Sequence, residues 1–167
     1  MPLEVPAGVG VFIDANIFHY AVIPVTPFTD AVLPFVNRLR AREFVGYASF
    51  QTLADAQHKT MLSLAAIQYG LTRSGMVGWL KNHPDQIQTL AGLTQAATML
   101  RALPLNILPS EETALLLEAA AICQAHGLLT NDALIVAVMQ RHGITHLATN
   151  DDDFDRVPGI TVWKPRP

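Results

Sequence analysis

The sequence has few cysteines, few charged residues and no long apolar run. Cys123 is the single cysteine among 167 residues, so no disulfide can form within the chain, and a reducing, cytoplasmic setting is expected. Only 15% of the residues are charged and the net charge is −3, which excludes the strong positive field of a non-specific nucleic-acid binder. No apolar run approaches the roughly 18 residues of a membrane span. We therefore expect no membrane partner, and a start without Lys or Arg is unlike a secretory leader.

Half of the residues are hydrophobic, which is ample material for a buried core. A length of 167 residues fits one domain, since single cores usually organise about 100–200 residues. No internal repeat, low-complexity tract or long linker divides the chain. We therefore expect residues 1–167 to form a single domain.

Short β-branched runs alternate with longer helical patterns along the chain. The expected strands are Val9–Ile13, Phe44–Tyr47, Leu105–Leu108, His146–Thr149 and Gly159–Trp163. The expected helices run from Phe50 to about Gln68 behind Ser49 as N-cap, from Pro84 toward Leu103, from Ser110 to His126, and from about Thr130 to His142. This alternation predicts an α/β fold with a central, mostly parallel sheet of about five short strands flanked by helices.

Four aspartates stand at positions that suit a catalytic site. Asp14 and Asp151 follow two of the expected strands, and ligands bind beyond the carboxyl ends of parallel strands. Asp132 lies in the first turn of an apolar helix, whose N-terminus stabilises the ionised form. Asp55 lies inside another helix beside apolar and small residues. Each has a purely structural alternative: a helix cap for Asp14 and Asp132, a solvated helix edge for Asp55, and a solvated turn for the run that begins at Asp151.

A cluster of these carboxylates requires a cation. Two carboxylates about 4 Å apart repel each other by roughly 4 kcal/mol at an effective dielectric constant near 20. Oxygen ligands favour Mg²⁺ or Mn²⁺, whereas Zn²⁺ would normally recruit Cys or His. One or two such ions can position water for attack on a phosphodiester. The sequence therefore predicts a magnesium or manganese site.

Residues next to the acids are candidates for orienting them. Asn16 and Asn131 flank two of the aspartates and Thr149 precedes a third, so hydrogen bonds to ligand carboxylates are expected. Helix capping remains the alternative for both asparagines, and if Asn16 is the cap, Asp14 is freer for another role. Asp153 competes with Asp151 in the same loop.

Two basic features have both a functional interpretation and a simpler one as solvated surface residues. Lys59 follows Asp55 by one helical turn, where it could contact a phosphate or simply be solvated. The densest basic patch comprises Arg38, Arg40 and Arg42, which could guide RNA or form a solvated helix face. In both cases the solvated alternative is the commoner one.

Three segments in this order resemble PIN-domain proteins, and specifically the VapC-type toxins of toxin–antitoxin pairs: Phe12–Phe18, Leu129–Ile135 and Leu147–Phe154. The resemblance extends from Val11 to Trp163. It implies that the first, third and fourth acidic ligands of the family fall on Asp14, Asp132 and Asp151, with Asp153 beside the last. The second family position is usually Glu, and here it is Asp55, which is one methylene shorter.

The resemblance implies a PIN-like fold, RNA cleavage, a homodimer and neutralisation by a small cognate antitoxin. Metal-activated water would leave a 5′-phosphate and a 3′-hydroxyl, because it needs no 2′-hydroxyl nucleophile. Two other functions stay open. A phosphatase with Asp14 as nucleophile is disfavoured, since Asn16 stands where its second aspartate is needed. A PIN-like module that binds RNA or a protein without cutting is supported only by the shorter acid at Asp55.

Overall fold

The computed structural model describes residues 3–23, 26–72 and 74–166. Within these ranges, five strands form one parallel sheet in the order β3-β2-β1-β4-β5. The strands are β1 (Gly10–Ile13), β2 (Val45–Ser49), β3 (Leu105–Leu108), β4 (His146–Ala148) and β5 (Thr161–Trp163). The predicted α/β class and parallel sheet are confirmed, and the strand bounds differ from the predicted ones by two residues or less.

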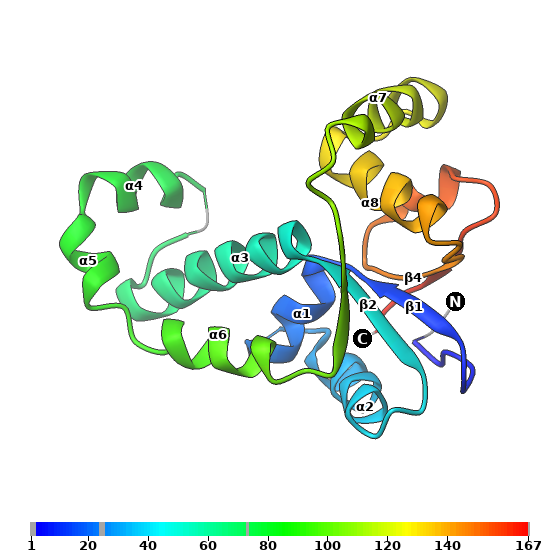
Figure 1. The fold of residues 1–167 in the computed structure, drawn as a ribbon. Coiled ribbons are helices and arrows are strands. Elements are labelled where there is room, and N and C mark those ends of the chain that lie inside the picture. Colours follow the sequence, from blue (N-terminus) through cyan, green and yellow to red (C-terminus); the bar gives the residue numbers. More distant parts are fainter. Residues whose placement is uncertain (1–2, 24–25, 73, 167) are drawn as a thin grey trace.

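Helices fill the connections between the strands (Figure 1). They are α1 (Ala15–Val22), α2 (Thr29–Arg40), α3 (Phe50–Tyr69), α4 (Met76–Asn82), α5 (Pro84–Gln88), α6 (Leu93–Arg101), α7 (Ala114–His126) and α8 (Thr130–Arg141), with a 3-10 turn, η1 (Asp152–Arg156). No single helix in the described ranges is long and apolar enough to cross a membrane, and α7 with α8 passes that test only as a pair bent by 111°.

Two predicted helices are wrong in their bounds. The helix expected from Pro84 toward Leu103 is broken into α5 and α6, because Gly92 adopts a φ of +81°, a left-handed conformation that ends regular helix. The helix expected from Ser110 begins only at Ala114. Glu112 lies before that start and pairs with Arg141 of α8. Glu112, which the sequence predicts in the first turn of this helix, therefore forms a tertiary contact instead.

The sheet is covered on both faces. On one face, Val11 and Ile13 pack with buried residues of α1 and α2. On the other face, Phe12 and Leu147 pack with α7 and α8. Figure 1 shows these two helix pairs on opposite sides of the strands. Because successive side chains of a strand point to opposite faces, β1 contributes to both cores and holds the layers together.

Helix α3 extends beyond the sheet and carries α4 and α5 at its far end (Figure 1). Its second half forms a separate small core with these helices around Met76, Leu80 and Leu90. Trp79 stacks on His83 there, with ring centroids 4.4 Å apart. The tryptophan thus serves packing in this extension.

The strand order reverses direction at β1. The chain proceeds from β1 to β2 and β3 on one side and then returns to β4 and β5 on the other. In parallel sheets the carboxyl ends of the two strands at such a point flank a crevice that ligands use. Asp14 is the first residue after β1, and Thr149 is the first after β4. The fold therefore brings the predicted acids to the edge where a ligand site is expected.

Gly46 in β2 allows α2 to approach the sheet closely. A Cβ atom at this position would lie 2.6 Å from Leu39 Cδ1 and 3.0 Å from Leu105 Cδ2. Because Leu39 is buried and cannot move aside freely, we expect Gly46→Ala to lower the free energy of unfolding by about 1–3 kcal/mol. Urea titration measures this. The matched control is Gly78→Ala in α4, where the new Cβ meets no described atom within 4 Å, and where alanine should be neutral or stabilising. Equal stability of the two variants would contradict the argument.

Candidate active site

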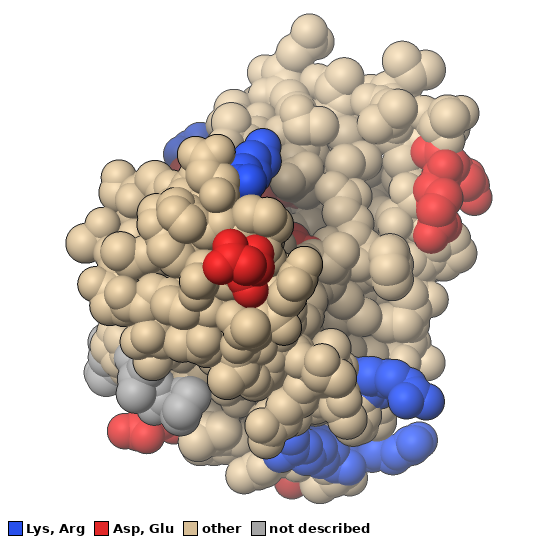
Figure 2. Space-filling model, turned by 90° about the vertical axis from the view of Figure 1, so that its left-hand side faces the viewer, with Lys and Arg blue, Asp and Glu red and all other residues tan. Residues whose placement is uncertain are grey.

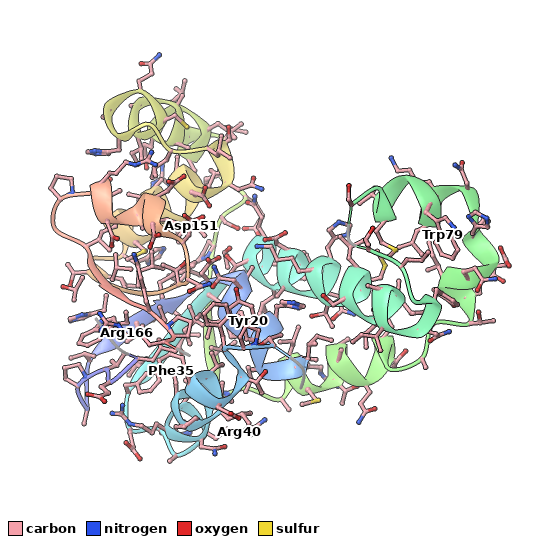
Figure 3. The ribbon with its side chains drawn as sticks, turned by 180° about the vertical axis from the view of Figure 1, so that it is seen from behind. Tyr20, Phe35, Arg40, Trp79, Asp151 and Arg166 are labelled. Atoms are coloured by element: carbon pink, nitrogen blue, oxygen red, sulfur yellow. The ribbon has the colours of Figure 1, made fainter. Side chains whose placement is uncertain are left out.

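A cleft opens at the carboxyl edge of β1, β2 and β4. Its polar lining comprises Asp14, Asn16, Ser49, Gln51, Thr52, Asp55, Lys59, Ser110, Asn131, Asp132 and Asp151. The four predicted acids and both predicted asparagines thus surround one cleft, although they come from four separate parts of the chain. Figure 3 shows Asp151 next to η1, below α7.

Asp14 is buried at the end of β1, with 7% of its surface exposed. It is itself the N-cap of α1: its Oδ1 accepts a hydrogen bond of 2.6 Å from the Ala15 amide. The alternative in which Asn16 caps this helix is wrong, because Asn16 already lies within the first turn. The second oxygen, Oδ2, accepts a bond of 2.7 Å from the Thr149 hydroxyl. Asp14 therefore has a fixed orientation while still lining the cleft.

Thr149 connects the ends of β1 and β4. It is fully buried, and its hydroxyl donates to Asp14 while accepting from Asn16 Nδ2 at 3.2 Å and from the Asp151 amide at 3.0 Å. Asn16 Oδ1 in turn accepts from the Asn150 amide at 3.2 Å. These bonds place Thr149 and Asn16 where they can orient two of the candidate ligands.

Asp132 lies in the first turn of α8 and faces the other acids. Burial, followed by the negative charges of Asp151, Asp14 and Asp153, raises the pKa of Asp132 to about 6. The expected effect of the helix N-terminus is therefore outweighed. Burial likewise raises the pKa of Asp14, against an opposing contribution from the Thr149 hydrogen bond. The protein alone disfavours the ionised form of both carboxyls, as is expected of acids that bind a cation.

Asp55 and Lys59 form an ion pair along α3. Their Oδ2 and Nζ atoms are 2.9 Å apart, one helical turn from each other. Burial lowers the pKa of Lys59, but the hydrogen bond to Asp55 and the charges of Asp14, Asp55 and Asp132 outweigh it, so the net pKa is raised. Lys59 lines the cleft. The i, i+4 spacing of Asp55 and Lys59 indicates such a pair in the sequence. The sequence alone nevertheless favours a solvated Lys59, because that is the commoner environment of a lysine on a helix.

The remaining predicted residues have other contacts. Asn131 Oδ1 accepts from Gln51 Nε2 at 3.1 Å and so joins α8 to α3. Asp153 pairs with Arg156 and is not among the described residues that line the cleft. Its amide donates to Asp151 Oδ1 at 2.9 Å. Of the two rivals, Asp151 is thus the one that faces the cleft.

Sequence reasoning missed several polar lining residues. Gln51 and Thr52 could have been found, because the first turn of a helix that follows a parallel strand lies at the same edge as the strand's end. Ser110 could not, since it reaches the cleft through the loop after β3, to which the sequence assigned a helix start.

The basic patch lies away from the cleft. Arg40 ends α2 and Arg42 precedes β2, which places them at the amino edge of the sheet. Arg38 pairs with Glu43 at 2.8 Å and donates to the Val5 carbonyl. In Figure 3, Arg40 lies at the lower end of the molecule, well below Asp151, and Figure 2 shows a group of Lys and Arg side chains at its lower end. Guidance of RNA into the cleft by this patch is therefore disfavoured by its position.

The side chains that line the cleft are of the chemical type that binds a hard divalent cation. The carboxylates of Asp14, Asp132 and Asp151 supply oxygen ligands only, which is the preference of Mg²⁺ and Mn²⁺. Among the described residues, no three His, Cys, Asp or Glu side chains lie close enough together to enclose a metal by themselves. Mg²⁺ commonly binds through one or two carboxylates, with water and substrate phosphate completing its shell. The residues therefore fit an open site of that type.

Comparison with known proteins agrees with this fold. A family model described as the PIN domain matches residues 11–160. A chain of VapBC2 from Rickettsia felis, solved with a DNA fragment from its promoter, has a similar fold at 17% identity and a TM-score of 0.55, covering 93% of this chain and 98% of that one. VapC20 of Mycobacterium tuberculosis, a sarcin-ricin-loop-cleaving toxin, matches at 17% identity and a TM-score of 0.55, covering 87% and 92%. No curated protein sequence matches the chain.

Proposed function

The chain belongs to the PIN domain family, and on that premise we propose that it is a Mg²⁺- or Mn²⁺-dependent endoribonuclease acting as the toxin of a toxin–antitoxin pair. The observation that carries the proposal is the convergence of Asp14, Asp132 and Asp151 on one cleft at the reversal point of the sheet. Acids from three distant segments gather there, although burial and then the charges of the neighbouring acids raise the pKa of Asp132. Such a cluster serves cation binding rather than stability.

In the proposed reaction, Asp14, Asp132 and Asp151 bind the cation through direct bonds and through its waters, and Thr149 orients two of these acids. When bound, the cation supplies a Lewis acid and a water of lowered pKa for hydrolysis of a phosphodiester. The Thr149 hydroxyl fixes Asp14 Oδ2, and the helix cap fixes Oδ1, so this carboxylate is set before substrate arrives. Orientation in advance is what a transition-state site requires.

The proposed partners are an RNA substrate, a second copy of the chain and a small cognate antitoxin. The solved neighbours support the antitoxin and the RNA substrate by their kind: one is part of a VapBC complex and the other is a toxin that cleaves the sarcin-ricin loop. The alternative is a PIN-like module that binds RNA or protein without cutting. The observation in its favour is that Asp55, at the place of the second family acid, is engaged by Lys59.

The decisive test is cleavage of a panel of RNAs by purified protein with Mn²⁺ or Mg²⁺ and with excess EDTA. We expect cleavage only with metal and products that carry a 5′-phosphate and a 3′-hydroxyl. Undiminished cleavage in EDTA would show that the metal mechanism is wrong. Mn²⁺ binding by calorimetry without cleavage of any RNA in the panel would favour the binding module.

Thr149→Val should weaken the site without unfolding the protein. Valine has nearly the same shape, but it leaves Asp14 Oδ2 without its donor and the Asp151 amide without its acceptor. We expect Mn²⁺ affinity to fall about 10–100-fold, as is usual when a group that orients metal ligands is lost. Titration calorimetry measures this. Thr98→Val, on the exposed side of α6, is the control and should keep full affinity.

A further inference from the structure

Lys59 is the single Lys or Arg among the described residues that line the cleft. Its charge interacts with Asp14, Asp55 and Asp132, so its ammonium group faces the acids rather than the solvent alone. About a third of its side chain, 35%, is exposed, which leaves it accessible to a ligand that enters the cleft. A cation in this position either balances the acids or binds an anionic substrate.

Three basic side chains from the last third of the chain are engaged by other acids. Arg156 pairs with Asp153 and donates to the Gly127 carbonyl. Lys164 pairs with Asp152 and Asp155. Arg141, at the C-terminal end of α8, pairs with Glu112 and Glu118. A phosphate entering the cleft therefore meets Lys59 as its only protein cation among the described lining residues.

Asp55 is placed to hold Lys59. The pair lies at i, i+4 with the acid on the N-terminal side, the favourable order on a helix. The shorter aspartate keeps its carboxylate on the helix beside Lys59, with 41% of the side chain exposed. Asp14, in contrast, is buried and fixed by two hydrogen bonds. The two acids are therefore built for different tasks.

Resting on the proposed nuclease function, we propose that Lys59 binds the scissile phosphate and that Asp55 is a positioning residue for Lys59 rather than a metal ligand. The phosphate brings a negative charge into a cleft that already holds four carboxylates. A charge-assisted bond from Lys59 offsets that repulsion at the point where the substrate must sit.

The first test compares the steady-state kinetics of Lys59→Met with those of the wild type on one cleaved RNA. We expect kcat/KM to fall about 100-fold, as for the loss of one charged contact to the reacting group, with Lys59→Arg recovering part of it. Lys81→Met, at an exposed position of α4, is the matched control and should behave as wild type. Wild-type kcat and KM in Lys59→Met would overturn the proposal.

The second test separates positioning from metal ligation at Asp55. Asp55→Asn should leave Mn²⁺ affinity within about twofold and raise KM, and the double change with Lys59→Met should be no worse than Lys59→Met alone, because both act through one group. A tenfold or greater loss of Mn²⁺ affinity in Asp55→Asn would instead identify a metal ligand and overturn the assignment.

The third test does not depend on cleavage. In the Asp132→Asn background, adding Lys59→Met should weaken binding of a fluorescent single-stranded RNA about tenfold or more, measured by anisotropy. An unchanged Kd would contradict phosphate binding by Lys59. If the wild type cuts no RNA and yet this loss occurs, the nuclease proposal fails while the phosphate contact stands.

Discussion

Asp14→Asn is expected to reduce RNA cleavage by about 1,000-fold or more while the fold is retained. A site that holds a catalytic cation contributes several kcal/mol to transition-state stabilisation, and each 1.36 kcal/mol is a factor of ten in rate. Asparagine removes the charge that the cation needs. It keeps an oxygen that can cap α1, because Asn and Asp are equally good N-caps. Activity and stability should therefore separate at this position.

The measurement is cleavage at saturating Mn²⁺, paired with thermal unfolding of the same samples. Asp30→Asn is the matched control, since Asp30 is an exposed acid in the first turn of α2. It should cut RNA like the wild type and lose at most about 1 kcal/mol of stability, the scale of a helix-dipole interaction. If Asp14→Asn retained more than a tenth of wild-type activity while folded, the assignment of Asp14 as a ligand would be wrong.

Local patterns were sufficient to predict the sheet. Phe12 and Leu147 are apolar residues in short β-branched runs, and both were placed in strands that the structure contains. Ser49 caps α3 as its residue type and position indicated, accepting from the Thr52 amide at 3.1 Å. Gly127 ends α7 with a φ of +67°. In each case the determinant lies within a few residues of the feature, so the sequence is informative.

The sequence is less informative where the partner of a residue lies far away in the chain. The position of Glu112 depends on Arg141, which is 29 residues away. Thr149 was assigned a supporting role, but its three simultaneous bonds to the segments after β1 and β4 depend on strand order, which periodicity does not contain. Lys59 was judged solvated because a helix seen alone does not show which side faces a cleft. The sequence therefore predicts the residue types of a site better than their partners.

Asp132→Asn is expected to make the metal-free protein more stable above pH 6 while abolishing cleavage. The pKa of Asp132 is about 6 in the folded protein, against an ordinary 3.8, through burial and then the charges of Asp151, Asp14 and Asp153. Between these pH values the folded chain holds the proton and the unfolded chain does not. Stability contributed by the protonated form is thus present below about pH 3.8 and is lost as the pH rises to about 6.

Two effects reduce the expected gain in the free energy of unfolding of Asp132→Asn. The full shift corresponds to about 3 kcal/mol, but Asp132 is partly exposed and solvent screening reduces it. The variant also loses the favourable position of a charge in the first turn of α8, worth about 0.3–1 kcal/mol. We expect a net gain of about 1 kcal/mol, or roughly 2–4 °C in Tm for a chain of this size.

Thermal unfolding in EDTA across pH 4–8, followed by titration with Mn²⁺, separates this explanation from a merely structural role. The wild type should be the less stable protein in EDTA at pH 7.5 and should gain stability as Mn²⁺ saturates the cleft, because a ligand that binds only the folded state stabilises it. Asp132→Asn should show a weaker pH dependence and little response to Mn²⁺. If the variant were less stable than the wild type in EDTA, Asp132 would be a stabilising helix residue rather than an acid whose charge is retained for a cation.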